Sequence, residues 1–168
     1  MKKHLPTALS GVIATTAVIG GDLSLTIEIP RLDVAEYHRP YVAAWIERPD
    51  RTVAANLAVW YDTEMRNDEG ETWLKDLRQW WRRTGRSLDM PVDGVSGPTR
   101  PPGKHALTFS TSDEALKALA DGEYNVVVEA AREVGGREML RIPFTLGKTS
   151  STAISGETEL GQIEFSIN

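Results

Sequence analysis

The stretch Asp22-Leu-Ser-Leu-Thr-Ile-Glu-Ile-Pro30 places a hydrophobic residue at every second position. A period of two predicts a strand with one buried face, and Pro30 ends it. Two further runs, residues 41–47 and 52–62, are rich in aromatic and β-branched side chains, which favour strands. Pro49-Asp50 lies between these runs as a turn signal, so the sequence predicts that they form a hairpin.

The second half of the chain repeats this pattern of short strands and glycine-rich turns. Four more strands are predicted, at residues 105–110, 123–133, 138–146 and 160–167. The Ser/Thr-rich segment 147–156 is expected to be a loop. About seven strands with one inserted helix predict a mainly β protein with an immunoglobulin-like β-sandwich. A partly closed barrel is the alternative architecture.

The hydrophobic period changes between residues 68 and 85. Asp68 and Glu71 match a capping box, which starts a helix. Hydrophobic residues then recur at helical spacing, at Trp73, Leu74, Leu77, Trp80 and Trp81. Neighbouring residues on a helix point about 100° apart. We therefore expect Trp73 and one of the pair Trp80 and Trp81 to pack in the core of the protein, on an amphipathic helix.

Composition limits the possible functions. The chain has 168 residues, a formal net charge of −5 and no cysteine. The length suits one domain with a hydrophobic core, and the negative charge argues against a nucleic-acid partner. Without cysteine, the protein has no disulfide bond, no thiolate metal site and no thiol nucleophile.

The N-terminus has the pattern of an export signal. Lys2 and Lys3 precede an uncharged run, residues 5–21, that is shorter than a typical membrane span. The sequence therefore predicts a signal peptide at residues 1–21 and a single periplasmic β-sandwich domain at 22–168, without stable membrane insertion after cleavage. An uncleaved anchor is the alternative.

Conventional catalytic patterns are missing from the sequence. His38 and His105 are the histidines outside the predicted signal, and their separation matches no usual metal-ligand spacing. The chain also lacks the nucleophile-elbow, phosphate-loop and dinucleotide-binding motifs. We therefore expect neither an enzyme nor a metal site.

One long segment, residues 88–104, is rich in proline and glycine and is predicted to be a loop. Within it, Asp93-Gly-Val-Ser-Gly-Pro-Thr99 resembles the Asp-x-x-Ser/Thr-Gly-Ala-Thr motif of bacterial domains that carry covalently bound flavin mononucleotide (FMN). Asp93, Ser96, Gly97 and Thr99 match the motif, and Pro98 stands in place of its alanine.

The resemblance implies a covalent FMN cofactor, attached through its phosphate to Thr99 by a flavin transferase that uses FAD. Asp93, Ser96 and Gly97 would be the recognition elements. Arg100 would pair with the phosphodiester. Trp80 or Trp81, together with His105, would line the flavin. The ordinary alternative is a rigid loop in which Thr99 caps a turn.

Four stretches of the chain together resemble the domain of unknown function 2271 family: residues 40–47, 73–81, 93–103 and 122–133. The resemblance implies a periplasmic location and neighbouring genes for membrane PepSY-type proteins, iron uptake or flavin transfer. A membrane redox protein is then the expected partner of an FMN carrier. The competing hypothesis is a cofactor-free binding module, linked to iron or metal uptake, that uses the tryptophan helix and the 88–104 loop.

Overall fold

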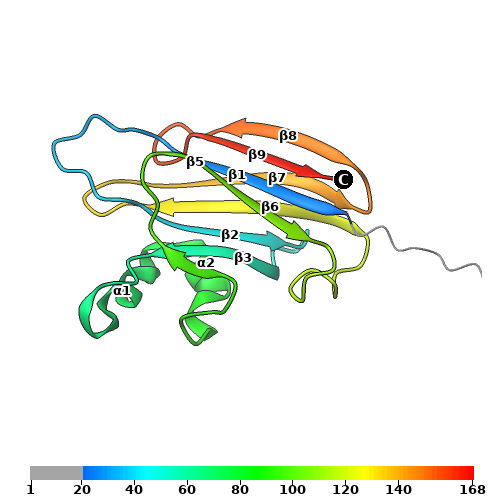
Figure 1. The fold of residues 1–168 in the computed structure, drawn as a ribbon, viewed down its shortest axis with the longest axis horizontal. Coiled ribbons are helices and arrows are strands. Elements are labelled where there is room, and N and C mark those ends of the chain that lie inside the picture. The colour runs from blue at the N-terminus through cyan, green and yellow to red at the C-terminus, as the bar shows by residue number, and fades with distance from the viewer. Residues whose placement is uncertain (1–20) are drawn as a thin grey trace, which may run out of the picture.

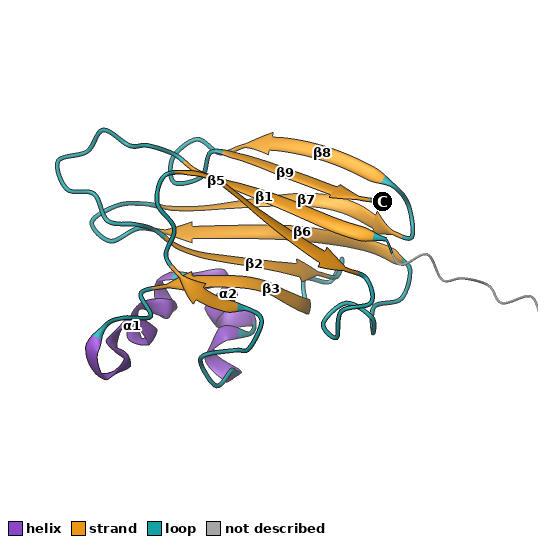
Figure 2. Cartoon of the chain, viewed as in Figure 1, coloured by secondary structure: helices purple, strands orange, loops and turns teal. Residues whose placement is uncertain are grey.

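A computed structural model describes residues 21–168, so the predicted export signal lies outside the described residues except for Gly21. The described chain forms nine strands in two sheets (Figures 1 and 2). The strands are β1 (Asp22–Ile29), β2 (Tyr41–Glu47), β3 (Val53–Tyr61), β4 (Ser96–Pro98), β5 (Gly103–Ser110), β6 (Gly122–Ala131), β7 (Arg137–Leu146), β8 (Ser150–Ser155) and β9 (Gln162–Ile167).

The two sheets lie face to face as a β-sandwich, which confirms the predicted fold class. One sheet has four strands in the order β5-β1-β9-β8, and the other has five in the order β4-β3-β2-β6-β7. Within residues 21–168 no strand pairs across the two sheets, so the sandwich and not the partly closed barrel is the architecture. The alternating hydrophobic residues of β1 are buried between the sheets, as their spacing predicts.

Both predicted hairpins are present. Strands β2 and β3 pair antiparallel through the turn at residues 48–52, and β6 and β7 pair antiparallel through residues 132–136. The pairing sets the start of β2 beside the ends of β3 and β6, at one end of the strands of the five-stranded sheet. Residues at this end of the sheet form part of the candidate site.

Two strands arise where the sequence predicts loops. Strand β8 falls inside the segment 147–156, and its serine and threonine side chains are mostly exposed. Because it has almost no buried face, it leaves no hydrophobic period, and pairing with β9 alone defines it. Strand β4 falls inside the segment 88–104 and has only three residues, which pair in parallel with β3.

A bulge in β3 changes which side chains face the interior. Ala44 pairs with Ala58 and Trp45 pairs with Asn56, so Leu57 is an extra residue in the ladder. An extra residue reverses the alternation beyond it. As a result Trp60 faces the core between the sheets, whereas Tyr61 faces the outer side of the five-stranded sheet.

The predicted helix is a chain of short helical pieces, which we call the helical segment 66–87. It contains α1 (Glu69–Thr72), α2 (Arg78–Arg83) and single 3-10 turns at Arg66–Asp68, Trp73–Asp76 and Gly85–Ser87. The predicted capping box is wrong, because Asp68 has a left-handed backbone (φ 56°) and its side chain makes no cap hydrogen bond. Leu77, with ψ 70°, interrupts the helix before α2.

The helical segment covers the outer face of the five-stranded sheet (Figure 1). Leu74, Leu77 and Trp80 are buried there against Trp45 and Val59 and form a second hydrophobic core. Trp80 also donates a hydrogen bond from Nε1 to the side-chain oxygen of Asn56 at 2.9 Å. Trp73, by contrast, is 44% exposed, so the prediction that it packs in the core is wrong.

Candidate functional site

The loop that carries the motif is tied to the end of strand β3. The Ser96 hydroxyl accepts a hydrogen bond from the Val92 amide at 2.8 Å, which closes a turn around the exposed Asp93. Gly94 in this turn has φ 69°, a conformation that favours glycine. The loop then runs alongside β3 as β4, and Thr99 follows directly after it.

Pro98 fits this arrangement without loss of a ladder hydrogen bond. The Val59 amide donates to the Val95 carbonyl, and the Thr99 amide donates to the Tyr61 carbonyl at 3.1 Å. Residues 95, 97 and 99 therefore direct their backbone groups toward β3, and Pro98 directs its own away from it. A proline on the open side of an edge strand is well tolerated. The departure from alanine is therefore compatible with the backbone of the loop.

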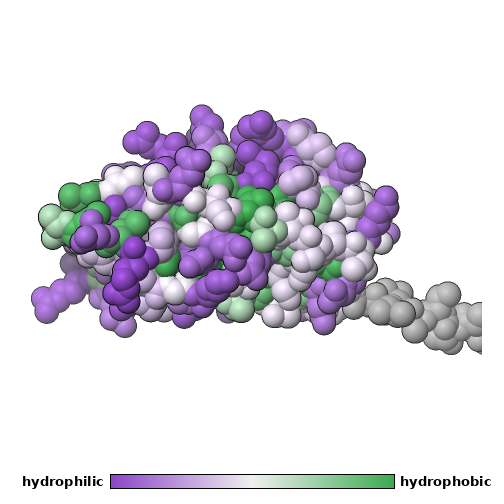
Figure 3. All heavy atoms as spheres, turned by 90° about the horizontal axis from the view of Figure 1, so that it is seen from above, coloured by the Kyte–Doolittle hydropathy of each residue, from purple (hydrophilic) through white to green (hydrophobic). Residues whose placement is uncertain are grey.

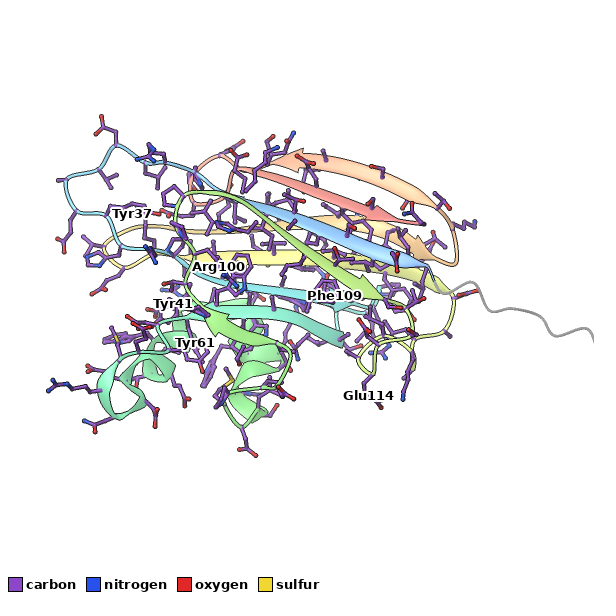
Figure 4. All side chains as sticks on the ribbon, viewed as in Figure 1. Tyr37, Tyr41, Tyr61, Arg100, Phe109 and Glu114 are labelled. Atoms are coloured by element: carbon purple, nitrogen blue, oxygen red, sulfur yellow. The ribbon has the colours of Figure 1, made fainter. Side chains whose placement is uncertain are left out.

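Arg100 and His105 lie against Trp60 on the inner side of the loop. The Arg100 guanidinium carbon lies 5.3 Å from the centre of the Trp60 ring, and the His105 ring meets Trp60 edge-on at 5.7 Å. The His105 ring also bonds the Pro101 carbonyl through Nε2 at 2.8 Å. These contacts hold the loop onto the sandwich. Arg100 is half-buried there (Figure 4).

Thr99 itself lines a cleft of about 600 Å³ at the opposite side of the loop. We call it the Thr99 cleft. Besides Pro98 and Thr99, its walls come from four segments: the start of β2 with the connection before it, the residues that follow β3, the helical segment 66–87, and the end of β6 with the β6–β7 turn. Its aromatic and hydrophobic members are Tyr37, Tyr41, Met65, Trp73, Pro98, Ala131 and Val134. A cleft of this volume with a mixed lining is typical of sites for small organic ligands.

Exposed hydrophobic side chains gather at this cleft. Four large hydrophobic residues are exposed among residues 21–168, and Met65, Trp73 and Val134 line the cleft, whereas Val34 does not. Figure 3 views the molecule from the side away from the helical segment 66–87, and there hydrophobic atoms in green lie at the left end, where Figure 1 places the β1–β2 connection and the β6–β7 turn. Exposed hydrophobic groups concentrated in one place are characteristic of a binding surface.

The position of Trp73 depends on a close approach between α1 and the end of β3. Tyr41 donates a hydrogen bond from its hydroxyl to the Gly70 carbonyl at 3.1 Å. A side chain at Gly70 would lie 1.9 Å from the Asp62 carbonyl oxygen, so only glycine fits there. Tyr41 also packs edge-on against Tyr61, with ring centres 6.3 Å apart (Figure 4). These contacts fix the helical segment 66–87 beside the cleft.

The lining carries charges of both signs. The acidic members are Asp62, Glu64, Asp76 and Glu133, and the basic members are Arg39, Arg132 and His38. His38 contacts Glu36 and Glu133, and Arg132 is paired with Glu159, whereas Arg39 makes no ion pair within residues 21–168. Arg39 is therefore the cation of the lining that is available to a bound anion.

Two tyrosines of the cleft are neutral hydroxyl donors at physiological pH. Burial raises the pKa of Tyr37 above its ordinary value of 10, although nearby Arg132 and Arg39 lower it in part. Burial also raises the pKa of Tyr41, against the opposing effect of a backbone hydrogen bond to Asp62. Both phenols thus remain protonated.

The structure brings together only part of the predicted site. Thr99 lines the cleft, and Ser96 and Gly97 shape the turn that leads to it. Arg100 and His105 lie on the inner side of the loop, next to Trp60, and do not line the cleft. The prediction for Trp80 is corrected, since it is fully buried and has no surface to offer a ligand.

Trp81 does not line the Thr99 cleft either. It is half-buried on the helical segment 66–87 and packs against the second core, with its ring centre 6.4 Å from that of Trp80. A second hollow, of about 710 Å³, lies at residues 51–56 and 82–84 and contains no aromatic side chain. Within residues 21–168, no three His, Asp or Glu side chains are grouped as a metal site requires.

Sequence reasoning missed Tyr41, Trp73 and Val134 as lining residues. Trp73 falls on the predicted hydrophobic stripe, which disguises its exposure, although the acidic neighbours Glu69, Glu71 and Asp76 hint at a solvated stretch. Val134 stands next to Gly135-Gly136 in a hairpin turn, where valine is unusual. This unusual residue is the signal in the sequence that could have pointed to Val134.

No helix within residues 21–168 has the length and hydrophobicity that a membrane span requires. No curated protein and no solved structure matches the chain. A family model described as "Predicted periplasmic protein (DUF2271)" matches residues 22–162, which is most of the sequence. The chain therefore belongs to the DUF2271 family of predicted periplasmic proteins.

Proposed function

We propose that this periplasmic protein is an electron carrier that bears FMN covalently on Thr99. The observation that carries the proposal is the position of Thr99: the last residue of the motif lines a cleft whose walls include exposed Trp73 and the tyrosines Tyr37 and Tyr41. Attachment at Thr99 would leave the flavin next to this wall. Aromatic walls suit flat conjugated rings, because stacking buries both faces of the contact.

The attachment reaction uses only groups that the proposal names. The Thr99 hydroxyl oxygen attacks the phosphorus of the FMN half of FAD, and the pyrophosphate bond breaks. AMP leaves, the hydroxyl proton is released, and a phosphodiester joins FMN to the protein. The protein gains the mass of FMN less one water. The transferase supplies the catalytic groups, so this chain acts as its substrate.

The loop presents Thr99 in a form that a transferase can use. Thr99 is a half-buried residue of the cleft lining, directly after the short strand β4. A side chain at Gly97 would be in ordinary contact with the Trp60 ring, at 3.6 Å. Arg39, which has no ion pair among the described residues, supplies the charge that a phosphodiester requires.

The carrier would exchange electrons with a membrane redox protein. An exposed cleft favours this role, because the flavin ring remains close to the surface and within reach of a partner. The protein needs no catalytic residue of its own for such a function. The reduced flavin returns its electrons to the next partner and the carrier is regenerated.

Intact-mass measurement after co-expression with a flavin transferase tests the proposal. We expect the wild-type chain to gain the mass of FMN less one water. Thr99→Ala abolishes the gain, and Thr99→Ser retains it because the hydroxyl remains. Thr63→Ala is the matched control, since Thr63 is a second, exposed threonine of the same cleft and its loss leaves the modification intact. A gain that survives Thr99→Ala contradicts the proposal.

The second candidate is a cofactor-free binding module linked to iron or metal uptake. The gathering of Met65, Trp73 and Val134 at the cleft favours it, because these exposed groups suit a ligand or partner whether or not Thr99 is modified. Partner capture by Trp73 and Thr99 variants distinguishes the two candidate functions. Partner capture that depends on Trp73 and is unaffected by Thr99→Ala would support the binding module.

A further inference from the structure

Trp73 presents one part of its indole ring to the Thr99 cleft and has a lysine over another. The residue is 44% exposed, and the Lys75 ammonium lies 5.3 Å from the centre of its ring. Trp73 lines the cleft, whereas Lys75 does not, so the ring surface in the cleft is the part that Lys75 leaves uncovered. A flat indole surface held in this way is a stacking platform for a conjugated ring.

Val134 stands at the rim of the same cleft in a strained conformation. It has φ 52° and is 71% exposed. A β-branched residue in the left-handed region is a true outlier, because its side chain crowds the backbone there. The next residue, Gly135, has no positive φ, so the left-handed position of this turn is occupied by valine and not by either neighbouring glycine. Strain at an exposed valine indicates that its side chain serves a purpose other than stability.

A buried ion pair braces the turn that displays Val134. The Arg132 side chain is 6% exposed and the Glu159 side chain 5%, and the two bond at 2.8 Å. Glu159 also accepts a hydrogen bond from the Gly136 amide at 2.8 Å. The turn folds closely over the guanidinium, since a side chain at Gly135 would lie 2.4 Å from Arg132. The conformation of Val134 is therefore imposed by its surroundings.

The charges of the cleft favour a ligand with a neutral ring. Four carboxylates, Asp62, Glu64, Asp76 and Glu133, line it with few free cations. A second phosphate group in the cleft would be repelled by these carboxylates. The retained FMN half, with one phosphodiester and an uncharged ring system, fits this lining better than a dinucleotide.

We infer that Trp73 is the ring-binding residue of the protein: the isoalloxazine ring stacks on its open surface, and Val134 packs at the rim of the ring. The inference rests on the proposed function for the identity of the ligand. It adds the residues that hold the ring, which the attachment motif does not specify. Trp73 comes from the helical segment 66–87 and Val134 from the β6–β7 turn, and both line the cleft that contains Thr99.

Flavin fluorescence of the modified chain tests the stacking directly. Indole in contact with a flavin quenches its emission, so Trp73→Leu raises the emission several-fold, and Trp73→Phe, which keeps a flat ring, retains tight contact with less quenching. Trp81→Phe is the control, because Trp81 does not line the cleft and its replacement leaves the emission unchanged. Unchanged emission in Trp73→Leu, with the added mass of FMN present, overturns the inference and leaves the proposed function standing.

A titration with free riboflavin tests ring binding by Trp73 independently of covalent attachment at Thr99. It uses the full chain prepared without a transferase and therefore requires no attachment. We expect saturable quenching, with affinity weakened about three- to tenfold in Trp73→Leu. Equal affinity in wild type and Trp73→Leu overturns ring binding by Trp73, whatever the mass measurement shows.

Val134→Gly distinguishes a ligand contact from a purely structural residue. Glycine relieves the left-handed strain, so the melting temperature rises. The loss of the side chain weakens riboflavin binding at the same time. Opposite shifts in stability and affinity support the inference. A higher melting temperature with unchanged affinity removes Val134 from the ring site.

Discussion

Glu129 is a fully buried carboxylate on the outer face of strand β6. Its oxygens accept hydrogen bonds from the backbone amides of Gln79 and Trp80, at 3.1 Å and 2.9 Å, and from the Arg137 guanidinium at 2.9 Å. The first amides of a helix have no partner within the helix itself. Glu129 supplies that partner for α2 from another element, which explains why the helix restarts after Leu77.

Glu129→Gln tests this role. The amide keeps one acceptor oxygen but turns a donor toward the backbone amides, so we expect a loss of about 1–3 kcal/mol in the free energy of unfolding. Urea denaturation measures it as a lower midpoint with an unchanged slope. Glu123→Gln, on the same face of the strand but exposed near its start, is the control and leaves the midpoint in place. An equal effect of both substitutions would mean that Glu129 does not cap α2.

The alternation of β6 predicts correctly that Tyr124, Val126, Val128 and Ala130 share one face. The same alternation assigns Glu129 to the opposite face, where a glutamate is normally solvated. The structure buries that face under the helical segment 66–87, and the partner amides lie 49 and 50 residues away in sequence. A contact at that separation leaves no trace in the local pattern, so sequence reasoning had no means to find it.

At the scale of the element, the β8–β9 turn is organised by a glutamate from another strand. Glu138 on β7 accepts hydrogen bonds from the amides of residues 157–160, the shortest from Glu157 at 2.6 Å. Burial raises the pKa of Glu138, but these amides outweigh burial and bring the pKa below its ordinary value of 4.5. The ionised carboxylate is thus part of the folded structure.

The lowered pKa makes this turn sensitive to acid. A carboxyl group whose pKa is lower in the folded state stabilises the protein above its ordinary pKa, and that stability is lost as pH falls through the folded value. We expect Glu138→Gln to be less stable than wild type at pH 7. The difference should narrow as pH falls below 4.5. Urea midpoints across this range measure it, and a constant difference would contradict the role of the charged form.

The elements show what a sequence pattern can and cannot determine. Strands β1 and β6 were predictable because each places regularly spaced hydrophobic residues in the core between the sheets, and β2 because it is rich in aromatic and β-branched residues. Strand β8 was not, because its exposed serines and threonines resemble a loop. The helical segment 66–87 has the spacing of one helix, yet it breaks at Leu77, where packing on the sheet and the bonds to Glu129 override local preference.

At the scale of the whole molecule, the five-stranded sheet is shared by two hydrophobic cores. One core lies between the sheets and includes Leu25, and the other lies under the helical segment 66–87 and includes Leu77. Strands β2, β3 and β6 contribute side chains to both. Damage to either core therefore destabilises the same strands, and we expect one cooperative unfolding transition.

Leu25→Ala and Leu77→Ala test this coupling, because both side chains are fully buried. Each substitution should lower the free energy of unfolding by about 2–5 kcal/mol. Tryptophan fluorescence and far-ultraviolet circular dichroism should report the same midpoint for each variant. Val34→Ala, at an exposed position, is the control. A separate early transition in Leu77→Ala would show that the helical segment 66–87 unfolds independently.

The candidate site illustrates the limit of sequence reasoning at this scale. Thr99 could be proposed from the sequence because the motif that contains it is contiguous. Trp73 and Val134 could not be proposed in this way, since only the fold brings together the lining residues 37–39, 41, 62–65, 73, 76, 98–99 and 131–134. The bulge at Leu57 is equally hidden, although it decides that Tyr61 faces outward next to Tyr41. Such features depend on long-range pairing.

The most direct test of the covalent carrier is the flavin content of the protein isolated from the periplasm of its own cell. The account predicts a yellow protein whose flavin absorbance stays with the polypeptide after denaturation and acid precipitation. After proteolysis the flavin should be found on the peptide that contains Thr99. A colourless protein, or a flavin that is released on denaturation, would contradict covalent attachment at this residue.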